Sequence, residues 1–440
     1  MHRRPVLLVV IMMMGLMVFG GAGHADNQFE KTKRSAVHGD ATSQFLLGFI
    51  YYYGEGVPLD YQEALKWFLK SARQGNIGAQ FLLGVMYFNG NGTAVDHSEA
   101  VKWYLKSAEQ GHSDAQYYLA NLYYAGEGVP LNYQEAMKWY LKSAEQGHDG
   151  AQCNLGFMHD KGHGVPVNHR EAMKWYLKSA EQGNQFAQYN LGVMYDTGEG
   201  VPVNYQEALD WYLKSAEQGN TGAQYNLGVM YDTGKGVSVN YQEAMKWFLI
   251  SAEQGNERAQ YNLGVMYDTG EGVPVNYQKA MKWFLKSAEQ GNELAQYNLG
   301  VMYSNGNGTP VNYKEGMKWF LKSAGQGNER AQYNLGNMYY AGEGVPADRT
   351  EATKWFLKAA EQGHQDAQYN LGVMYFKGEG VPVDLVKSYA WMSVASNQGN
   401  EGAKDSINII AEDMTPEQIA EARKDAALLL ENMLKSKQDQ

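Results

Sequence analysis

The feature that most constrains this chain is the spacing of its tryptophans. Each Trp lies 36 residues after the one before it, and no Trp lies off this lattice. A fixed period between about 20 and 50 residues is typical of solenoids and repeat arrays. The 440 residues are therefore expected to form an array of repeats rather than separate globular domains. The lattice consists of Trp67, Trp103, Trp139, Trp175, Trp211, Trp247, Trp283, Trp319, Trp355 and Trp391.

One repeat, residues 187–219, has the pattern of two short helices. Apolar residues recur at helical spacing from Ala187 to Tyr195, which predicts a first amphipathic helix. Gly192 lies in the middle of that helix, where glycine costs about 1 kcal/mol relative to alanine. Because a glycine recurs at this position in nearly every copy, we expect another helix to cross closely there.

Glycines and a capping residue separate the two helices. Gly198 and Gly200 are expected to end the first helix, since glycine adopts the left-handed conformation at low cost. Asn204 is expected to cap a second helix that runs to about Gln218, and Glu207 would complete a capping box. The same pair recurs as Asp60/Glu63, Asn132/Glu135, Asn240/Glu243 and Asn312/Glu315. The stripe predicted to be buried on the second helix is Ala208, Trp211, Tyr212 and Ala216.

Each helix pair has two apolar faces and only one partner within the repeat, so the pairs must stack to bury the second face. The sequence predicts an all-α fold, an α/α superhelical solenoid of about ten 36-residue helix-turn-helix repeats. The Trp lattice would form the core between repeats. A capping helix is expected over 26–40, the repeats over 41–398, and capping helices over 399–440. Thr415-Pro416-Glu417-Gln418 predicts the start of the last helix, which would run to about Leu434.

The N-terminus differs in composition from the repeats. Residues 1–25 contain basic residues, an apolar stretch over 6–19 and then small residues, which predicts a secretory signal peptide. The alternative is an uncleaved membrane anchor. A cleaved signal would place the protein in the periplasm or outside the cell, with no membrane span remaining. The net charge of −11 argues against nucleic acid and anionic lipid as partners.

Candidate chemical sites are few. The lone cysteine, Cys153, excludes an intrachain disulfide. It shares a repeat with His159, His163, His169 and Asp160, but this spacing matches no common zinc framework. Replacement of aromatic residues at repeat positions explains most of this group, so no metal site is predicted. His112, His148 and His364 stand where other copies have a turn Asn, and we expect them to be caps. No phosphate-binding loop or catalytic group is recognised, so neither an enzyme nor a cofactor is predicted.

These repeats resemble the Sel-1-like repeat, a relative of the tetratricopeptide repeat. The copy at 187–219 carries the pattern at Ala187, Leu191, Gly192, Tyr195, Gly198, Gly200, Asn204, Ala208, Trp211, Ala216 and Gly219. The resemblance covers about residues 27–411 and implies a superhelical adaptor or scaffold for other macromolecules. Some disulfide-rich relatives are suggested to have weak hydrolase or lactam-binding activity, but this chain lacks their paired cysteines.

The resemblance to tetratricopeptide arrays implies that the first helices line a concave face. The residues expected there are pairs of Tyr and Asn, which could bind a protein or extended peptide, or a cell-wall glycan. The alternative is that these side chains only tie neighbouring helices together. The pairs are Tyr189/Asn190, Tyr225/Asn226, Tyr261/Asn262, Tyr297/Asn298 and Tyr333/Asn334.

Three functions remain open at this point. The first is a non-catalytic, exported scaffold that binds a protein or peptide through its concave face. The second is an envelope protein associated with peptidoglycan or another glycan, and the third is a virulence factor that contacts a host. Because fold does not determine function, the repeats alone do not decide among them.

Overall fold

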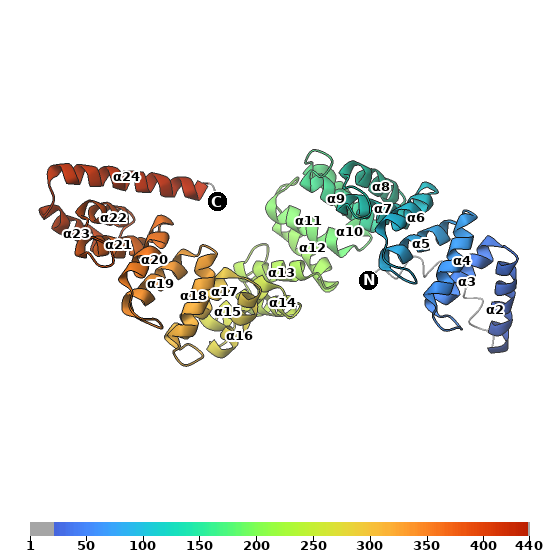
Figure 1. The fold of residues 1–440 in the computed structure, drawn as a ribbon, viewed down its shortest axis with the longest axis horizontal. Helices are drawn as coiled ribbons and strands as arrows, with labels where there is room; N and C mark the ends of the chain where they lie inside the picture. The colour runs from blue at the N-terminus through green and yellow to red at the C-terminus, as the bar shows by residue number, and fades with distance from the viewer. Residues whose placement is uncertain (1–21, 439–440) are drawn as a thin grey trace. The chain divides into compact units, whose positions relative to one another are not determined.

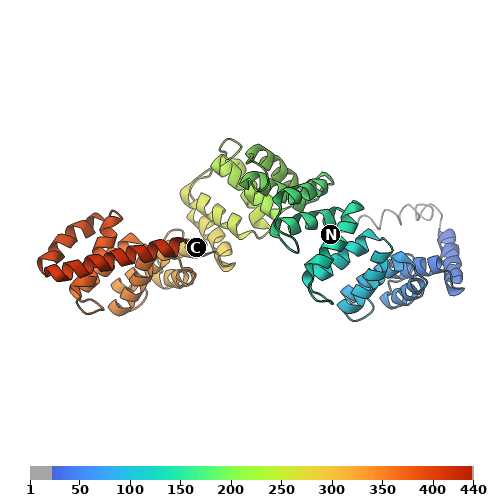
Figure 2. The ribbon, with the colours of Figure 1, turned by 90° about the horizontal axis from the view of Figure 1, so that it is seen from above.

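The computed structural model describes residues 22–438, and side chains over 28–435. The predicted signal peptide falls largely on residues 1–21, outside the described residues, while Ala22–Ala25 belong to helix α2. Within the described range every regular element is a helix, and ten consecutive pairs of helices follow α2 (Figures 1 and 2). The prediction of an all-helical solenoid of ten repeats is confirmed.

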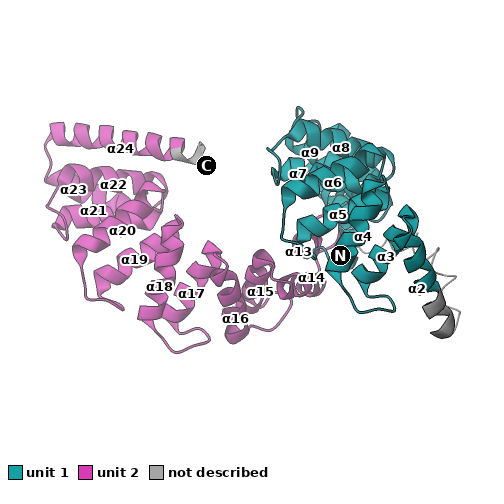
Figure 3. Ribbon diagram, turned by 45° about the vertical axis from the view of Figure 1, so that its right-hand side comes forward, with its two compact units in different colours: residues 1–220 teal, residues 221–440 magenta. Residues whose placement is uncertain are grey.

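The chain divides into two compact units, residues 1–220 and 221–440 (Figure 3). Unit 1 contains α2 (Ala22–Val37), α3 (Ala41–Tyr53), α4 (Tyr61–Arg73), α5 (Ile77–Asn89), α6 (His97–Glu109), α7 (Ser113–Ala125), α8 (Tyr133–Glu145), α9 (Asp149–Lys161), α10 (His169–Glu181), α11 (Gln185–Thr197) and α12 (Tyr205–Glu217). Unit 2 contains α13 (Thr221–Thr233), α14 (Tyr241–Glu253), α15 (Glu257–Thr269), α16 (Tyr277–Glu289), α17 (Glu293–Asn305), α18 (Tyr313–Gly325), α19 (Glu329–Ala341), α20 (Arg349–Glu361), α21 (Gln365–Lys377), α22 (Leu385–Asn397), α23 (Glu401–Glu412) and α24 (Pro416–Gln438).

The odd-numbered helices from α3 to α21 are the first helices of the pairs, and the even-numbered helices from α4 to α22 are the second. Within each unit, every first helix packs on the second helix of its own pair, which in turn packs on the next first helix. Gly198, in the left-handed conformation with φ 83°, ends the first helix of the repeat at 187–219. The side chain of Asn204 caps the second helix by accepting a hydrogen bond from the Glu207 N–H. These residues therefore set the helix ends where the sequence predicts them.

The glycine inside nearly every first helix marks the close crossing that its recurrence predicts. A Cβ added to Gly192 would lie 2.5 Å from ring carbons of Tyr212, on the second helix of the same pair. Tyr212 is fully buried, and a Tyr or Phe occupies its position in pairs α3/α4 through α19/α20. Except in pair α7/α8, where Ala120 takes the glycine position, the core of each of these pairs is therefore an aromatic ring seated on a backbone without a side chain.

The tryptophans are less buried than the predicted core would require. Trp103, Trp139 and Trp391 are buried, but the other seven are half-buried. They do lie at the joints between pairs, since Trp283 packs on the cluster around Phe248 in the preceding pair. The exposed faces are covered by lysines, as where the Lys214 Nζ lies 4.0 Å from the Trp211 ring centroid. Of the predicted buried stripe, Ala208, Tyr212 and Ala216 are buried, whereas Trp211 is only half-buried.

In the predicted capping boxes of the second helices, only one of the two expected hydrogen bonds forms. Asn240 accepts a hydrogen bond from the Glu243 N–H at 3.1 Å, as expected. Its own N–H donates instead to the Tyr231 carbonyl on the preceding helix at 2.8 Å. The Glu243 side chain therefore does not accept this N–H, and it forms an ion pair with Lys246 instead, with 3.1 Å between Glu243 Oε2 and Lys246 Nζ. The reciprocal half of the box is therefore replaced by a contact between the two helices of the pair.

Polar ties join the two helices of each pair and also join one pair to the next. The Ser287 hydroxyl donates to the Glu257 carbonyl at 2.8 Å, and the Gln290 amide donates to Gln260 Oε1 at 2.7 Å. The Gln260 amide in turn donates to the Ala252 carbonyl at 3.0 Å. The Ser and Gln ties recur at a separation of 30 residues in both units, for example Ser215 to Gln185 and Gln218 to Gln188. The Ser and Gln ties hold the two helices of one pair together, whereas the bond from Gln260 to the Ala252 carbonyl fixes that pair on the preceding α14.

Helices that depart from the repeat pattern lie at both ends of the described chain. In unit 1, α2 packs on α3. In unit 2, α23 and α24 both pack on α22. Thr415 and Gln418 form a complete capping box, with the Thr415 N–H donating to Gln418 Oε1 at 2.9 Å and the Gln418 N–H donating to Thr415 Oγ1 at 3.3 Å. The last helix therefore begins where the sequence predicts, and it continues past Leu434 to Gln438.

Candidate binding surface

The first helices of unit 2 form a closely packed row. Neighbouring members of the row contact one another directly, namely α13 with α15, α15 with α17 and α17 with α19. Neighbouring second helices of the described unit do not approach each other as closely. Since the more tightly spaced row of a bent stack lies on its inner side, the first helices line the concave side of this unit.

The tyrosines predicted to bind are half-buried, as are the asparagines beside them. Each tyrosine ring packs on the core aromatic ring of its own pair, at a centroid separation close to 6 Å. The contacts are Tyr189–Tyr212, Tyr225–Phe248, Tyr261–Phe284, Tyr297–Phe320 and Tyr333–Phe356. One side of each ring is therefore fixed by the core, while part of the ring stays in contact with solvent.

The same tyrosines also join neighbouring first helices. Burial raises the pKa of Tyr225, and a hydrogen bond with the Asn262 side chain partly offsets this rise. Burial likewise raises the pKa of Tyr261, and a hydrogen bond with the Asn298 side chain, one repeat further on, partly offsets this rise. Asn334 differs, because its amide donates to the Arg330 carbonyl of its own helix at 3.0 Å. The tyrosines thus have a structural role, as the packing alternative predicts, without being enclosed between repeats.

A cavity of about 380 Å³ lies on this row, across α15, α17 and the start of α19. Three of the residues that line it were predicted from the sequence, namely Tyr261, Tyr297 and Asn298. The sequence reasoning missed the others, which lie in the first turns of the helices or cap them: Glu293, Leu294, Asn328, Glu329 and Arg330. A signal for them exists, because the second residue of the first helix varies among copies that are otherwise nearly identical: it is Gly222, Arg258, Leu294 and Arg330 in successive repeats.

The other residues of the predicted Tyr and Asn pairs do not line this cavity. They are Tyr189, Asn190, Tyr225, Asn226, Asn262, Tyr333 and Asn334. Asn190 and Asn226 are both half-buried, on α11 and α13. The Asn190 side chain forms a hydrogen bond with Tyr176, the buried core ring of the preceding pair, and this bond partly offsets the rise that burial causes in the pKa of Tyr176.

Several of the predicted pairs therefore lie outside this cavity. The amide of Asn190 is engaged with the core of the preceding pair, because the crossing of α10 and α11 brings the two side chains together. Asn226 precedes the repeats whose first turns form the cavity, so it contributes nothing to the lining. Binding by Asn190, Asn226 and the other pairs outside the cavity stays a prediction.

The lining of this cavity combines three kinds of chemistry. Tyr261 and Tyr297 present ring surface, and Leu294, with 43% of its surface exposed, adds an apolar patch. Glu293 and Arg330 supply charges of opposite sign, and Asn298 supplies an amide. The residues that line this described cavity include no Ser, Thr, Cys, His or Lys. The arrangement suits reversible binding of a chain with mixed polarity.

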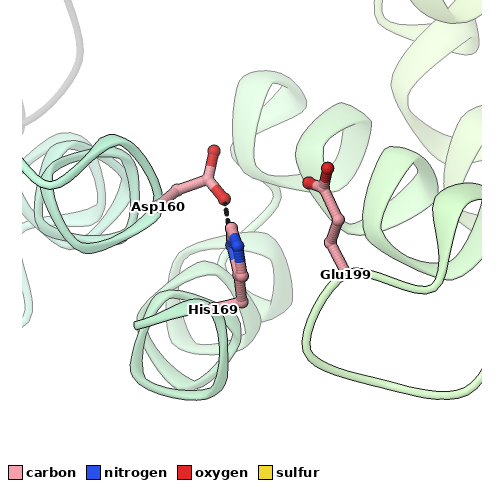
Figure 4. Close-up of side chains that lie close together, drawn as sticks. All are labelled: Asp160, His169 and Glu199. Carbon is pink, nitrogen blue, oxygen red and sulfur yellow. Dashed lines mark hydrogen bonds and ion pairs between the residues drawn. The ribbon is translucent and has the colours of Figure 1, made fainter. Parts of the chain in front are cut away.

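Cys153 and the three histidines that share its repeat do not form a single site. Cys153 is buried, and burial raises the pKa of its thiol to about 12. His163 Nδ1 lies 2.8 Å from the Tyr124 hydroxyl, whereas His169 Nδ1 lies 2.9 Å from Asp160 Oδ1. Within the described residues, the one group of potential metal ligands that converges is Asp160, His169 and Glu199 (Figure 4). Glu199 belongs to the next repeat and was not considered in the sequence reasoning.

The three histidines expected to be caps do cap first helices. His112, His148 and His364 each accept a hydrogen bond from the backbone N–H three residues on, at 3.2 to 3.3 Å. They are not exposed, however, because each ring also stacks on an aromatic ring of the preceding pair. His364, for example, stacks on Tyr333 at a centroid distance of 4.4 Å.

None of the helices that the structure describes is both long and apolar enough to cross a membrane.

Comparisons with known proteins agree with this architecture. A search of curated proteins gave no match. Among solved structures, a protective antigen with an SLR fold from uropathogenic Escherichia coli strains is 35% identical, with a TM-score of 0.61, over 93% of this chain and 97% of that one. A Sel1 repeat protein from Oxalobacter formigenes is 34% identical, with a TM-score of 0.57, over 74% of this chain and 92% of that one.

The Sel1 repeat model matches ten consecutive segments of the sequence. The matched residues are 41–76, 77–112, 113–148, 150–184, 185–220, 221–256, 257–292, 294–328, 329–364 and 365–400. Each match covers one pair of helices as the structure defines them. This chain belongs to the Sel1 repeat family.

Proposed function

We propose that this protein is a non-catalytic scaffold that binds an extended segment of a partner protein along the first helices of unit 2. Sel1 repeat proteins generally mediate interactions between proteins, and their solenoid fold is typically non-catalytic. The observation that carries the proposal is the cavity lined by Tyr261, Tyr297 and Asn298. It lies on the row of side chains for which the sequence predicts binding.

The packing of the tyrosines favours binding at low entropic cost. Their rings are already fixed against Phe284 and Phe320, so ordering them on association costs little. Tyrosine also offers a large apolar surface together with a hydroxyl group. The Asn298 side chain has more donors and acceptors than its bond with Tyr261 uses, so it can also pair with a peptide backbone. Arg330 can form two parallel hydrogen bonds with a carboxylate of the partner. We therefore expect the partner segment to carry an acidic residue next to an apolar one.

Exposed residues of the cavity provide the sharpest test. Peptides selected from a displayed random library would be titrated by fluorescence anisotropy against the wild-type protein and two variants, Leu294→Arg and Arg330→Glu. Both variants should weaken binding by about 1–3 kcal/mol if these side chains contact the peptide. Leu321→Arg is a matched control, because Leu321 is similarly exposed, at 40%, on a second helix of the same unit.

Two results would refute the proposal. One is the absence of any selected peptide that binds better to this protein than to an unrelated helical protein. The other is equal loss of binding in Leu321→Arg and Leu294→Arg. A third assay, sedimentation with isolated cell wall, addresses the glycan alternative. Cell-wall binding that survives both cavity variants, without peptide binding, would favour a glycan-associated role instead.

We also propose that the protein is exported. The basic and apolar residues of segment 1–25 support this, and so does the description of the similar E. coli protein as a protective antigen. Export with cleavage after Ala25 places the mature N-terminus at Asp26. Mass spectrometry of the protein recovered from periplasmic and culture fractions tests both points. Recovery of the uncleaved chain in the cytosol would contradict export.

A further inference from the structure

Three side chains from different segments of unit 1 converge on one point. Asp160 lies near the end of α9, His169 is the first residue of α10, and Glu199 lies in the turn after α11. Each offers one ligand-type atom, and these atoms all lie within 4.8 Å of one another. His169 Nδ1 and Asp160 Oδ1 are already 2.9 Å apart. Figure 4 shows the two carboxylate groups on either side of the imidazole.

The fold brings the same three positions together in earlier repeats, where other residues occupy them. In one repeat His97 Nδ1 lies 3.6 Å from a Glu127 carboxylate oxygen and stacks on Phe88. In the next, the Tyr124 hydroxyl lies 2.8 Å from His163 Nδ1. Each of these triads contains an aromatic residue that cannot act as a carboxylate or imidazole ligand. Among the described residues, only the triad of Asp160, His169 and Glu199 offers three such ligands.

We propose that Asp160, His169 and Glu199 form a binding site for a divalent cation, with Zn²⁺ as the best match. One imidazole nitrogen and two carboxylate oxygens are a ligand set that zinc accepts, with water in the fourth position. Two carboxylates and a neutral imidazole carry a charge of −2, which a divalent cation neutralises. The cation would join α9 and α10 to the turn of the following repeat and so stabilise the joint between them.

The geometry requires only small movements. A tetrahedral zinc with ligand distances of about 2.0–2.1 Å separates its ligand atoms by about 3.3 Å. The Asp160 and His169 atoms, now at 2.9 Å, would separate slightly, while the exposed Glu199 side chain would move closer. Lys161 Nζ now lies 2.7 Å from the other oxygen of Asp160. Because the Lys161 side chain is 51% exposed, its ammonium group can turn into solvent when a cation arrives.

Zinc titration with a competing chromophoric chelator tests the site in purified protein that has been stripped of metal. Wild type should bind one Zn²⁺ per chain. His169→Tyr should weaken that binding by about tenfold or more, because it removes one of three protein ligands. Tyrosine stands at the equivalent positions 133 and 205, so this variant should retain the fold, which circular dichroism checks. Asp160→Asn is a second variant that changes charge with little change in shape.

His97→Tyr is the matched control, since it makes the same change in a triad with one ligand fewer. It should leave zinc affinity unchanged. Cobalt substitution provides a second measurement, because tetrahedral Co²⁺ gives intense visible absorption bands that His169→Tyr should abolish. The proposal is overturned if His169→Tyr and His97→Tyr bind zinc equally, or if wild type shows no saturable binding site.

Discussion

Replacement of Gly228 by alanine tests the close crossing of helices inside a repeat. Gly228 lies in the middle of α13, and a Cβ built on it would be 2.5 Å from two ring carbons of Phe248. Ordinary contacts between carbon atoms are about 3.5–4.0 Å, so the overlap is about 1 Å. Phe248 is 1% exposed and is enclosed by the core of its pair. The ring therefore has no free space into which it can move.

Two opposing effects determine the size of the change in stability. Alanine favours a helix over glycine by about 1 kcal/mol, whereas one extra methyl group in a packed core costs about 1–3 kcal/mol. We expect Gly228→Ala to destabilise unit 2 by about 1 kcal/mol net, opposite in sign to the effect of helix propensity alone. The fold should survive, because Ala120 occupies the equivalent position in α7.

Gly325→Ala is the control. Gly325 is the last residue of α18, does not have a positive φ, and a Cβ there would meet nothing within 4 Å. It should stabilise by about 0.4–1 kcal/mol. Urea unfolding followed by circular dichroism measures both variants, and both lie in unit 2. Since long arrays can unfold in more than one step, the midpoints of the transitions are compared rather than a single extrapolated free energy.

A double-mutant cycle separates steric overlap from other causes. Phe248→Leu shortens the side chain that the new methyl group meets, so part of the cost of Gly228→Ala should disappear in the double variant. A coupling energy of at least about 0.5 kcal/mol is expected for residues in contact. If Gly228→Ala is as stabilising as Gly325→Ala, or if the two changes are strictly additive, the explanation from close crossing is wrong.

Three further predictions concern other parts of the fold. Burial lowers the pKa of His364 in the folded protein. As the pH drops, the unfolded chain therefore takes up this proton before the folded protein does, and the free energy of unfolding should fall below about pH 6.5. His364→Asn should reduce this fall in thermal melts between pH 8 and pH 5. Gln260→Met leaves the buried Ala252 carbonyl without its partner, while the exposed Gln290 amide can bind water instead. It should cost about 1–3 kcal/mol in urea unfolding, and a cost under about 0.5 kcal/mol would contradict the role of these ties. Because burial raises the pKa of Cys153 to about 12, a maleimide should label it slowly in the native protein and rapidly in denaturant, as mass spectrometry can follow.

The sequence predicted those features that depend on neighbours along the chain. The 36-residue period, the glycine stop at Gly198 and the cap at Asn204 are local signals, and the structure places each of them as expected. The period also identified Gly192 as a crossing point. The period did not identify which side chain of the second helix packs on Gly192. Trp211 and Tyr212 are adjacent on that helix and recur with the same spacing, and the structure shows that Tyr212 is the one in contact.

Features that depend on contacts between segments escaped prediction. The capping box at Asn240 failed because the Tyr231 carbonyl takes the backbone N–H, and this partner is not visible in a local pattern. The Gln ties repeat as regularly as the tryptophans, but a separation of 30 residues has no meaning until the two helices of a pair are packed together. Likewise, Leu294 and Arg330 belong to the candidate cavity only because successive helices bring their first turns together.

The polar ties at the joints have a consequence for how such a gene can change. At these joints the amide of a Gln on a first helix donates to an Ala carbonyl on the preceding second helix, as Gln260 does to Ala252 and Gln296 does to Ala288. The bond joins the same two positions of successive repeats, as also from Gln188 to Ala180 in unit 1, so different repeats offer compatible partners to each other. Unequal recombination between near-identical copies would therefore insert or remove whole blocks of 36 residues and leave every remaining joint chemically intact. Length is thus the property of this protein that can vary most freely, whereas a change of even one residue in the period would break the register at that joint.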